Sequence, residues 1–138
     1  MAWVRRLSGN KGRRFAAGLC ISLCWQSPAA ASPDETVRGE IEHLLTHLET
    51  SGCEFFRNGD WHEAGRARRH IERKYAWLVK RDLVASTEQF IERAATESSR
   101  SGEAYLVRCA QSESVPSADW MTDALTRLRG DAAASREQ

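Results

Sequence analysis

The stretch CEFFRNGDWHEAGRARRHIERKY, residues 53–75, carries the strongest indications of how this 138-residue chain folds. It begins with a cysteine and places the pair Asn58-Gly59 between aromatic residues. That pattern is typical of a tight hairpin turn, because both central positions accept a positive φ. A helical pattern crowded with Arg, His and Lys follows. We therefore predict two short extended segments over 53–61 and a helix over about 62–80.

The predicted helix has an apolar face and a basic face. At about 100° per residue, one stripe collects five apolar residues, which are Ala64, Ala67, Ile71, Tyr75 and Leu78. Three basic residues lie opposite this stripe: Arg66, Arg69 and Arg73. His70 and Lys74 lie at the border of the apolar face. The stripe is expected to pack into the core and the basic face to remain outside.

Three more helices are predicted around this segment. The first spans 32–52, where apolar residues recur at three-four spacing, and Gly52 is expected to end it. The second spans 86–99 and begins with Ser86 and Gln89 as a capping box. A strand is expected at 104–109, and a last helix, capped by Ser117, at 117–129. The expected fold is α+β and mostly helical, with about four helices, two or three short strands and one disulfide.

The first 31 residues have the layout of a secretory signal peptide. They hold five basic residues and no acidic one, followed by the apolar run FAAGLCISLCW (15–25) and the small residues Ala29 and Ala31. The apolar run is too short to span a membrane, which takes about 20 residues. We therefore expect cleavage after Ala31 and a periplasmic or secreted protein without a transmembrane segment in its mature chain. Residues 32–130 would form one small domain, and 131–138 a flexible tail.

Two of the four cysteines, Cys20 and Cys24, lie in the predicted signal peptide. Cys53 and Cys109 remain, and an oxidising compartment favours a disulfide between them, with free or metal-bound thiols as the alternatives. The bridge would close a loop of about 57 residues and contribute about 4 kcal/mol in the chain-entropy view. For a domain of this size we expect that contribution to be a large share of its total stability.

Charge is distributed unevenly along the predicted mature chain. Residues 57–81 contain eight basic and three acidic residues, whereas the rest of the mature chain contains seven basic and sixteen acidic ones. A basic surface of this kind can bind an anionic small ligand or an acidic envelope protein. The alternative is a solvated helix face neutralised by nearby carboxylates. We expect no nucleic acid partner, because the mature chain is acidic overall.

Catalytic and metal-binding signatures are weak. The chain has no G-x-S-x-G and no H-E-x-x-H motif. His43 and His47 are four residues apart, yet no third ligand is evident nearby, and we expect neither a metal ion nor a cofactor. The enzymatic alternative is a cell-envelope hydrolase or transferase that uses His70 as a base with a serine from the 98–101 cluster.

Three ordered strings resemble a known family of small exported bacterial proteins. They are S-G-C-E-F-x-R-N-G (51–59), A-x-x-H-x-x-x-K-Y (67–75) and F-I-x-x-A-A-x-x-S-S-x-S-G-x-x-Y-L-V-R-C (90–109). With the tryptophan-containing helix after Pro116, the chain is similar to the domain of unknown function 5329 family over about 37–129. The resemblance implies an exported one-domain protein whose two cysteines close these segments on each other. It implies no activity.

The resemblance also selects candidate site residues. Seven polar residues belong to its pattern: Arg57, Asn58, His70, Lys74, Ser98, Ser99 and Ser101. They flank the expected bridge between Cys53 and Cys109 on both sides, so we expect them to lie on one surface. The resulting hypothesis is a non-enzymatic binding or interaction module with a basic surface for an anionic ligand or an acidic partner.

Overall fold

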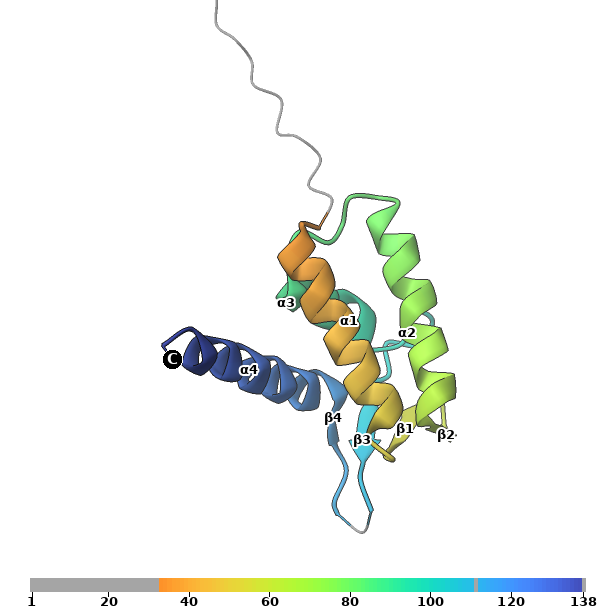
Figure 1. Cartoon of the computed structure of the whole chain (residues 1–138). Coiled ribbons are helices and arrows are strands. Elements are labelled where there is room, and N and C mark those ends of the chain that lie inside the picture. The colour runs from red at the N-terminus through yellow and green to blue at the C-terminus, as the bar shows by residue number, and fades with distance from the viewer. Residues whose placement is uncertain (1–32, 111, 138) are drawn as a thin grey trace, which may run out of the picture.

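A computed structural model describes residues 33–110 and 112–137 of the chain (Figure 1). The predicted signal peptide lies outside these residues. The elements in order are α1 (Glu35–Thr50), β1 (Glu54–Arg57), β2 (Asp60–Glu63), α2 (Ala64–Val79), α3 (Thr87–Phe90), the π-helical turn η1 (Ile91–Ala95), β3 (Leu106–Arg108), β4 (Val115–Pro116) and α4 (Ser117–Arg136).

The predicted α+β, mostly helical class is confirmed. Helices α1 and α2 lie side by side and run in opposite directions, and the small sheet lies at the end where the β1–β2 hairpin joins them (Figure 1). The described sheet is antiparallel, with strand order β2-β1-β3-β4. Four strands form instead of two or three, because the short strand β4 pairs with β3 just before the last helix.

The hairpin forms as predicted around Asn58-Gly59. Arg57 pairs with Asp60 across the turn, which leaves Asn58 and Gly59 as a two-residue loop. Their φ angles are 51° and 87°, in the left-handed region that such a loop requires. The turn therefore fixes the register of β1 and β2, and with it the positions of Arg57 and of the residues that lead into α2.

The predicted disulfide between Cys53 and Cys109 is confirmed, with Cα atoms 4.2 Å apart. It joins the residue before β1 to the residue after β3. The adjacent cross-strand pair, Glu54 and Arg108, adds an ion pair of 2.7 Å. Bridge and ladder together hold the hairpin against the late part of the chain.

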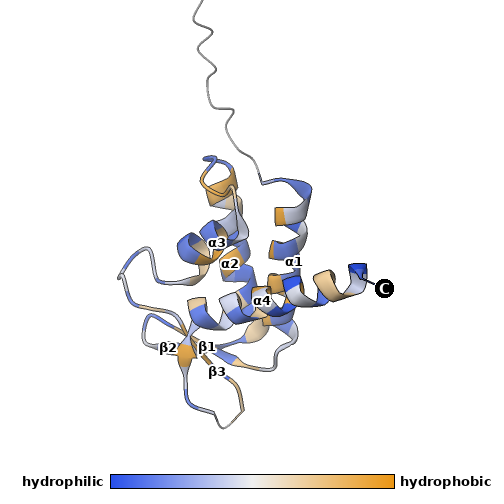
Figure 2. Ribbon diagram, turned by 90° about the vertical axis from the view of Figure 1, so that its left-hand side faces the viewer, coloured by the Kyte–Doolittle hydropathy of each residue, from blue (hydrophilic) through white to orange (hydrophobic). Residues whose placement is uncertain are grey.

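The core lies where α1, α2 and α4 meet the sheet and the α3–η1 segment. The apolar stripe expected for the first helix is Val37, Ile41, Leu44, Leu45 and Leu48; α1 buries the last four, and Val37 packs against the core at its edge. The hydrophobic positions of α1 lie on its inner side in Figure 2. Of the predicted α2 stripe, Ala64, Ile71 and Leu78 are buried, and Ala67 and Tyr75 pack against the core at its edge. The period assigned to α2 from the sequence is therefore correct.

The helix predicted over 86–99 is wrong in its extent. Helix α3 covers only Thr87–Phe90 and then widens into the π-helical turn η1, which ends at Ala95. The chain then leaves the helix because Glu97 forms a β-bridge with Ala104. Half of the expected capping box is present: the Ser86 hydroxyl accepts from the Gln89 N–H at 3.2 Å, but the Gln89 side chain bonds the N–H of Ala85.

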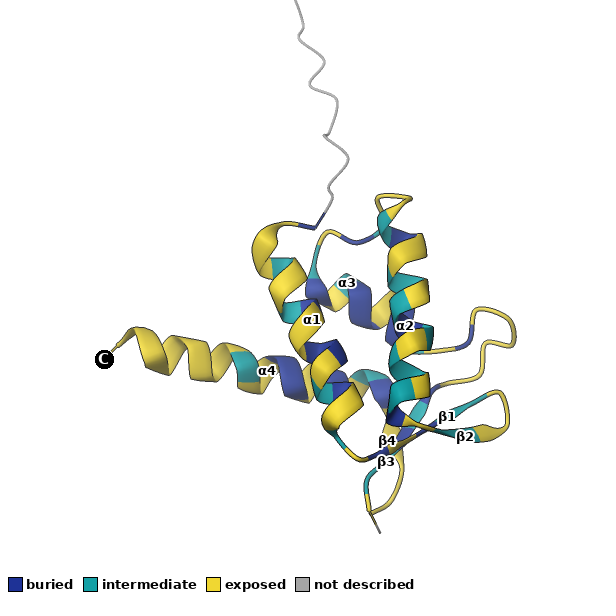
Figure 3. Cartoon of the chain, turned by 45° about the vertical axis from the view of Figure 1, so that its right-hand side comes forward, coloured by how far each residue is buried: buried dark blue, intermediate teal, exposed yellow. Residues whose placement is uncertain are grey.

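Helix α4 also differs from its prediction. It continues to Arg136, so 131–136 of the expected tail are helical, and its later turns are exposed (Figure 3). Ser117 is not its N-cap; Pro116 holds that position, and Ser117 is the first helical residue. The Ser117 N–H donates to the carbonyl of Tyr105 at 2.9 Å. At the other end, Arg129 forms ion pairs with Glu40 and Glu88, which tie α4 to α1 and α3.

None of the described helices combines the length and the apolar character that crossing a bilayer demands.

Candidate functional site

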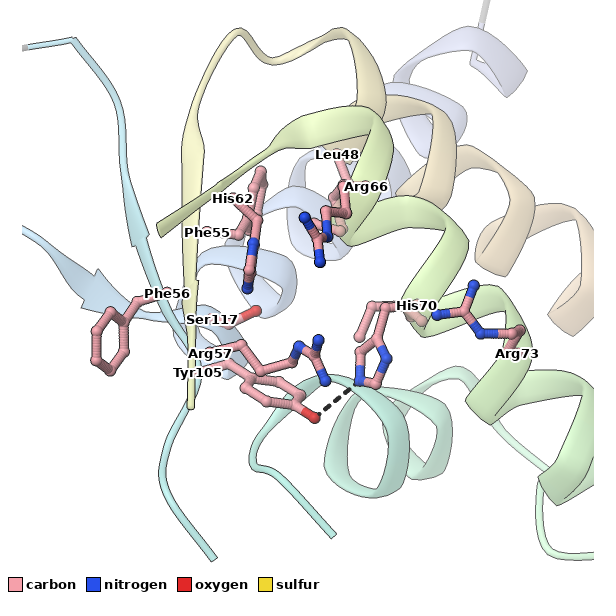
Figure 4. A pocket seen from close by; sticks show the side chains of 12 residues that line it. Leu48, Phe55, Phe56, Arg57, His62, Arg66, His70, Arg73, Tyr105 and Ser117 are labelled. Atoms are coloured by element: carbon pink, nitrogen blue, oxygen red, sulfur yellow. Dashed lines mark hydrogen bonds between the residues drawn. The ribbon is translucent and has the colours of Figure 1, made fainter. Parts of the chain in front are cut away.

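A cavity of about 110 Å³ lies between the β1–β2 hairpin, α2 and the start of α4 (Figure 4). Its polar lining comprises Arg57, His62, Arg66, His70, Arg73, Tyr105 and Ser117. Its apolar lining comprises Leu48, Phe55, Phe56, Ala67 and Ile71. The ring of Phe56 points away from the other side chains in Figure 4 and packs on Trp61 at 5.4 Å. The cavity thus combines basic groups with a partly apolar wall.

The basic side chains reach this cavity from two elements. Arg66, His70 and Arg73 are four and three residues apart on α2, so they project from one side of the helix. Arg57 is the last residue of β1, directly before the hairpin turn. In Figure 4 the guanidinium groups of Arg57 and Arg66 and the rings of His62 and His70 surround one common space. The fold therefore gathers positive charge there.

The cavity arginines lack the acidic partners that other arginines have. Within residues 33–110 and 112–137, no ion pair joins Arg57, Arg66 or Arg73 to a carboxylate. By contrast, Arg68 on the same helix contacts three carboxylates at 2.7–2.9 Å. Arg129 contacts two. The basic run of the sequence is therefore neutralised in one place and left uncompensated in another.

His70 is held by Tyr105. The His70 Nε2 and the Tyr105 hydroxyl are 3.0 Å apart, and the two rings meet edge to face. Burial, reinforced by the positive charges of Arg57 and Lys74, lowers the pKa of His70 to about 4. Burial raises the pKa of Tyr105. Near neutral pH the pair is therefore an uncharged imidazole bonded to a protonated phenol, and it can offer hydrogen bonds without a charge.

Lys74 lies beside the cavity and is not part of its lining. Its ammonium group donates to the carbonyl of Glu97 at 2.8 Å and lies 5.0 Å from the centre of the Tyr105 ring. Burial lowers the pKa of Lys74, and the nearby Glu97 carboxylate acts in the opposite direction. Lys74 thus fixes the segment that carries Tyr105 and supports the position of the phenol.

Asn58 and the serines of the 98–101 cluster do not line this cavity. The Ser101 hydroxyl donates to the side-chain oxygen of Asn58 at 3.1 Å, and both line a separate, open depression with Arg100 and Glu103. Ser98 is buried, with 3% of its surface exposed, and its hydroxyl lies near Tyr105. Ser99 is exposed. Of the seven predicted site residues, Arg57 and His70 line the cavity, and the other five surround it or lie apart.

Sequence reasoning missed five polar residues of the cavity: His62, Arg66, Arg73, Tyr105 and Ser117. The four- and three-residue spacing that places Arg66 and Arg73 beside His70 was available as a signal. Tyr105 belongs to the third family string, but it was assigned only to a strand. Ser117 was interpreted as a helix cap. Nothing local in the sequence indicates that Ser117 faces the cavity, because its position depends on the tertiary fold.

The donor set of the cavity suits an anion better than a metal ion. In the described segments, no group of three or more His, Cys, Asp or Glu side chains is arranged to hold a metal ion. His47, one member of the pair considered from the sequence, stacks on Trp120 at 4.5 Å. Guanidinium, imidazole and hydroxyl groups around one space can instead donate hydrogen bonds to a negatively charged group.

Comparison with known proteins identifies the family. Searches of curated proteins and of solved structures gave no match. A family model matches residues 35–129, which include every element from α1 to most of α4. This match confirms the resemblance inferred from the three strings. The chain therefore belongs to the Family of unknown function (DUF5329).

Proposed function

We propose that the protein is an exported, non-enzymatic binding module that holds an anionic group in the cavity beside α2. One observation carries this proposal. Three arginines, Arg57, Arg66 and Arg73, belong to the lining of the same small cavity, and no ion pair with a described carboxylate neutralises them. The anionic group belongs either to a small ligand or to an acidic side chain of a protein partner.

Physical reasons favour an anion at this place. Arginine presents a rigid fork of N–H donors that matches the oxygens of carboxylate and phosphate groups. Like charges close together repel one another, so an anion between them relieves an unfavourable interaction as well as adding favourable ones. The buried side chains of Leu48, Phe55 and Ile71 form part of the wall, and they lower the local dielectric constant. Interactions with charge are stronger there than on an open surface.

The test measures anion binding in three versions of the protein. Thermal unfolding is followed with acetate, benzoate, sulfate and phosphate at constant ionic strength, and binding is measured by calorimetry. The double variant Arg57→Gln with Arg66→Gln removes cavity charge. Arg69→Gln is the matched control, because Arg69 lies on the same helix, is exposed and does not line the cavity.

We expect at least one of these anions to bind the wild type and the Arg69→Gln protein at least tenfold more tightly than the double variant. Ligands that bind the native state raise its melting temperature, so the shift in unfolding should follow the same order. If none of the four anions binds, or if all three proteins bind equally well, the proposal is wrong.

The hydrolase or transferase alternative stays a prediction. The contacts of the described residues give binding more support: His70 Nε2 lies at the Tyr105 hydroxyl, and Ser101 is engaged with Asn58. A general base needs its nucleophile within about 3 Å. In the cavity lining, the serine that accompanies His70 is Ser117, outside the 98–101 cluster.

A further inference from the structure

We propose that the anionic group is the phosphoryl group of a phosphomonoester, and that the Ser117 hydroxyl is its innermost hydrogen-bond donor. This inference rests on the proposed function and specifies its ligand. The observation behind it is that donors approach the cavity from three separate elements: the hairpin with Arg57 and His62, α2 with Arg66 and His70, and the start of α4 with Ser117.

The burial and orientation of Ser117 support its assignment as a donor to the ligand. Its residue surface is 3% exposed, and its hydroxyl points into the space between Arg57 and His62 in Figure 4. Its N–H is bonded to Tyr105, whereas its hydroxyl has no hydrogen bond to any side chain or carbonyl of the described residues. This hydroxyl faces the cavity, where an oxygen of a bound ligand would accept a hydrogen bond from it.

The start of α4 brings Ser117 to the cavity, and no other residue of this 20-residue helix belongs to the lining. The first turn of α4 also carries Asp119, whose carboxylate offsets the positive potential of the helix N-terminus. The contribution of α4 to the ligand is therefore the Ser117 hydroxyl rather than the helix dipole.

The arrangement of donors distinguishes a phosphoryl group from a carboxylate. A carboxylate has two oxygens in one plane and is saturated by one or two guanidinium forks. A phosphoryl group has three non-bridging oxygens that point in different directions, so it can use donors from three sides at once. Its charge at neutral pH is about −1.5 to −2. That charge is the better match for a lining that contains Arg57, Arg66 and Arg73.

Size indicates how such a ligand would be placed. A closed apolar cavity of about 150 Å³ accommodates benzene. The cavity here has about 110 Å³, which is enough for a phosphoryl group and too little for a sugar or a lipid body as well. The cavity is open on one side, where Arg66 and Arg73 are exposed. The esterified body would therefore remain outside, and the source would be a soluble phosphomonoester or a phosphomonoester lipid headgroup.

Calorimetry with two ring-bearing probes tests the ligand class. Phenyl phosphate and benzoate are titrated into the purified protein at pH 7 and constant ionic strength. We expect phenyl phosphate to bind at least tenfold more tightly than benzoate. If benzoate binds as tightly or more tightly, the phosphomonoester inference is wrong while the proposed anion-binding function stands. If phenyl phosphate, benzoate, acetate, sulfate and phosphate all fail to bind, both proposals are wrong.

The role of Ser117 is tested with Ser117→Ala and with Ser99→Ala as the control. A hydrogen bond to a charged group contributes about 1.5–3 kcal/mol, so Ser117→Ala should weaken phenyl phosphate binding by about tenfold or more and leave benzoate binding nearly unchanged. Ser99→Ala should bind like the wild type, because Ser99 is exposed outside the cavity. Equal affinities of Ser117→Ala and wild type for phenyl phosphate would remove Ser117 from the site.

A second variant keeps this test decisive. Ser117→Asp places a carboxylate where the phosphoryl group would bind, so it should abolish the response to phenyl phosphate while the protein stays folded by circular dichroism. Retained binding would contradict the proposed location.

Vesicles of phosphatidylcholine with and without phosphatidic acid, a phosphomonoester lipid, distinguish a lipid headgroup from a soluble ligand. If the protein sediments with the phosphatidic acid vesicles and phenyl phosphate releases it, the ligand is a lipid headgroup. If the protein binds phenyl phosphate but does not sediment with these vesicles, the ligand is a soluble phosphomonoester.

Discussion

The two sides of helix α2 use the same residue type in opposite ways. Toward α1, Arg68 is 17% exposed in its side chain and contacts three carboxylates, from Glu42, Glu49 and Glu72. Toward the hairpin, Arg66 and Arg73 line the cavity beside His70 and have no such partners among the described residues. One basic run of the sequence thus contains a structural arginine and a group of uncompensated ones.

This difference separates stability from binding on a single helix. A charge that is surrounded by carboxylates stabilises the fold and has no capacity left for a ligand. Charges that repel one another destabilise the fold slightly and are available to an anion. Net charge along the sequence cannot distinguish these cases.

Removing the disulfide should have the largest effect and should act on the cavity side of α2. In the double variant Cys53→Ser with Cys109→Ser, the free energy of unfolding should fall by about 4 kcal/mol, because the unfolded chain gains the freedom of a long loop. The bridge connects β1, which carries Arg57, to β3, which follows Tyr105.

Urea denaturation measures this loss of stability. Calorimetry at low temperature measures anion binding by the folded fraction of the double variant. We expect binding to weaken along with stability. A loss below 1 kcal/mol would mean that the hairpin is held mainly by its ladder and by core packing.

Arg68→Ala should reduce the free energy of unfolding by about 2 kcal/mol, since it removes charge-assisted hydrogen bonds and leaves three carboxylates close together. Anion binding should be unaffected, because Arg68 does not line the cavity. Arg69→Ala is the control and should change stability by less than about 0.5 kcal/mol. The contrast between the two sides of α2 fails if Arg68→Ala is as harmless as Arg69→Ala.

Acidification should lower the free energy of unfolding through protonation of His70, which lies on the cavity side of α2. Its pKa is about 4 in the folded protein and about 6.5 in an unfolded chain, so the unfolded state takes up the proton first as the pH falls. The stability contributed by the neutral imidazole is therefore complete above pH 6.5 and is lost progressively toward pH 4.

Urea midpoints at pH 7, 6 and 5 for the wild type and His70→Gln measure this dependence. The positive groups that face His70 are Arg57, Arg73 and Lys74, with His62 as a further titratable neighbour. We expect a shallower decline in His70→Gln than in the wild type. Identical slopes would show that other groups control the acid response.

The smallest effect should come from Arg66→Gln. Removing one of several like charges should raise the free energy of unfolding by a few tenths of a kcal/mol at low ionic strength, and 0.5 M NaCl should erase the gain by screening. Thermal unfolding at both salt concentrations checks this. A destabilised Arg66→Gln protein would mean that Arg66 has a structural partner after all.

The sequence predicted those parts of the molecule that depend on local patterns. The Asn58-Gly59 turn follows from residues that accept positive φ, the α2 stripe from a 3.6-residue period, and the bridge from the two remaining cysteines. The end of the third helix could not be predicted, because it depends on the β-bridge between Glu97 and Ala104.

The candidate site was predicted only in part for the same reason. Arg57 and His70 were selected from the family pattern, and Arg66 and Arg73 could have been added from their spacing on α2. Ser117 and Tyr105 could not be placed. Their positions depend on the backbone hydrogen bond between them and on the packing of α4, which are tertiary contacts.

The backbone hydrogen bond from Ser117 to Tyr105 has a consequence for the order of folding. A chain made from its N-terminus completes the hairpin and α2 first, and these supply Arg57, His62, Arg66 and His70. The phenol and the hydroxyl arrive only with the last third of the sequence. Contacts between such distant segments form slowly. The cavity is therefore completed late, and a growing chain presents its arginines well before it can enclose an anion.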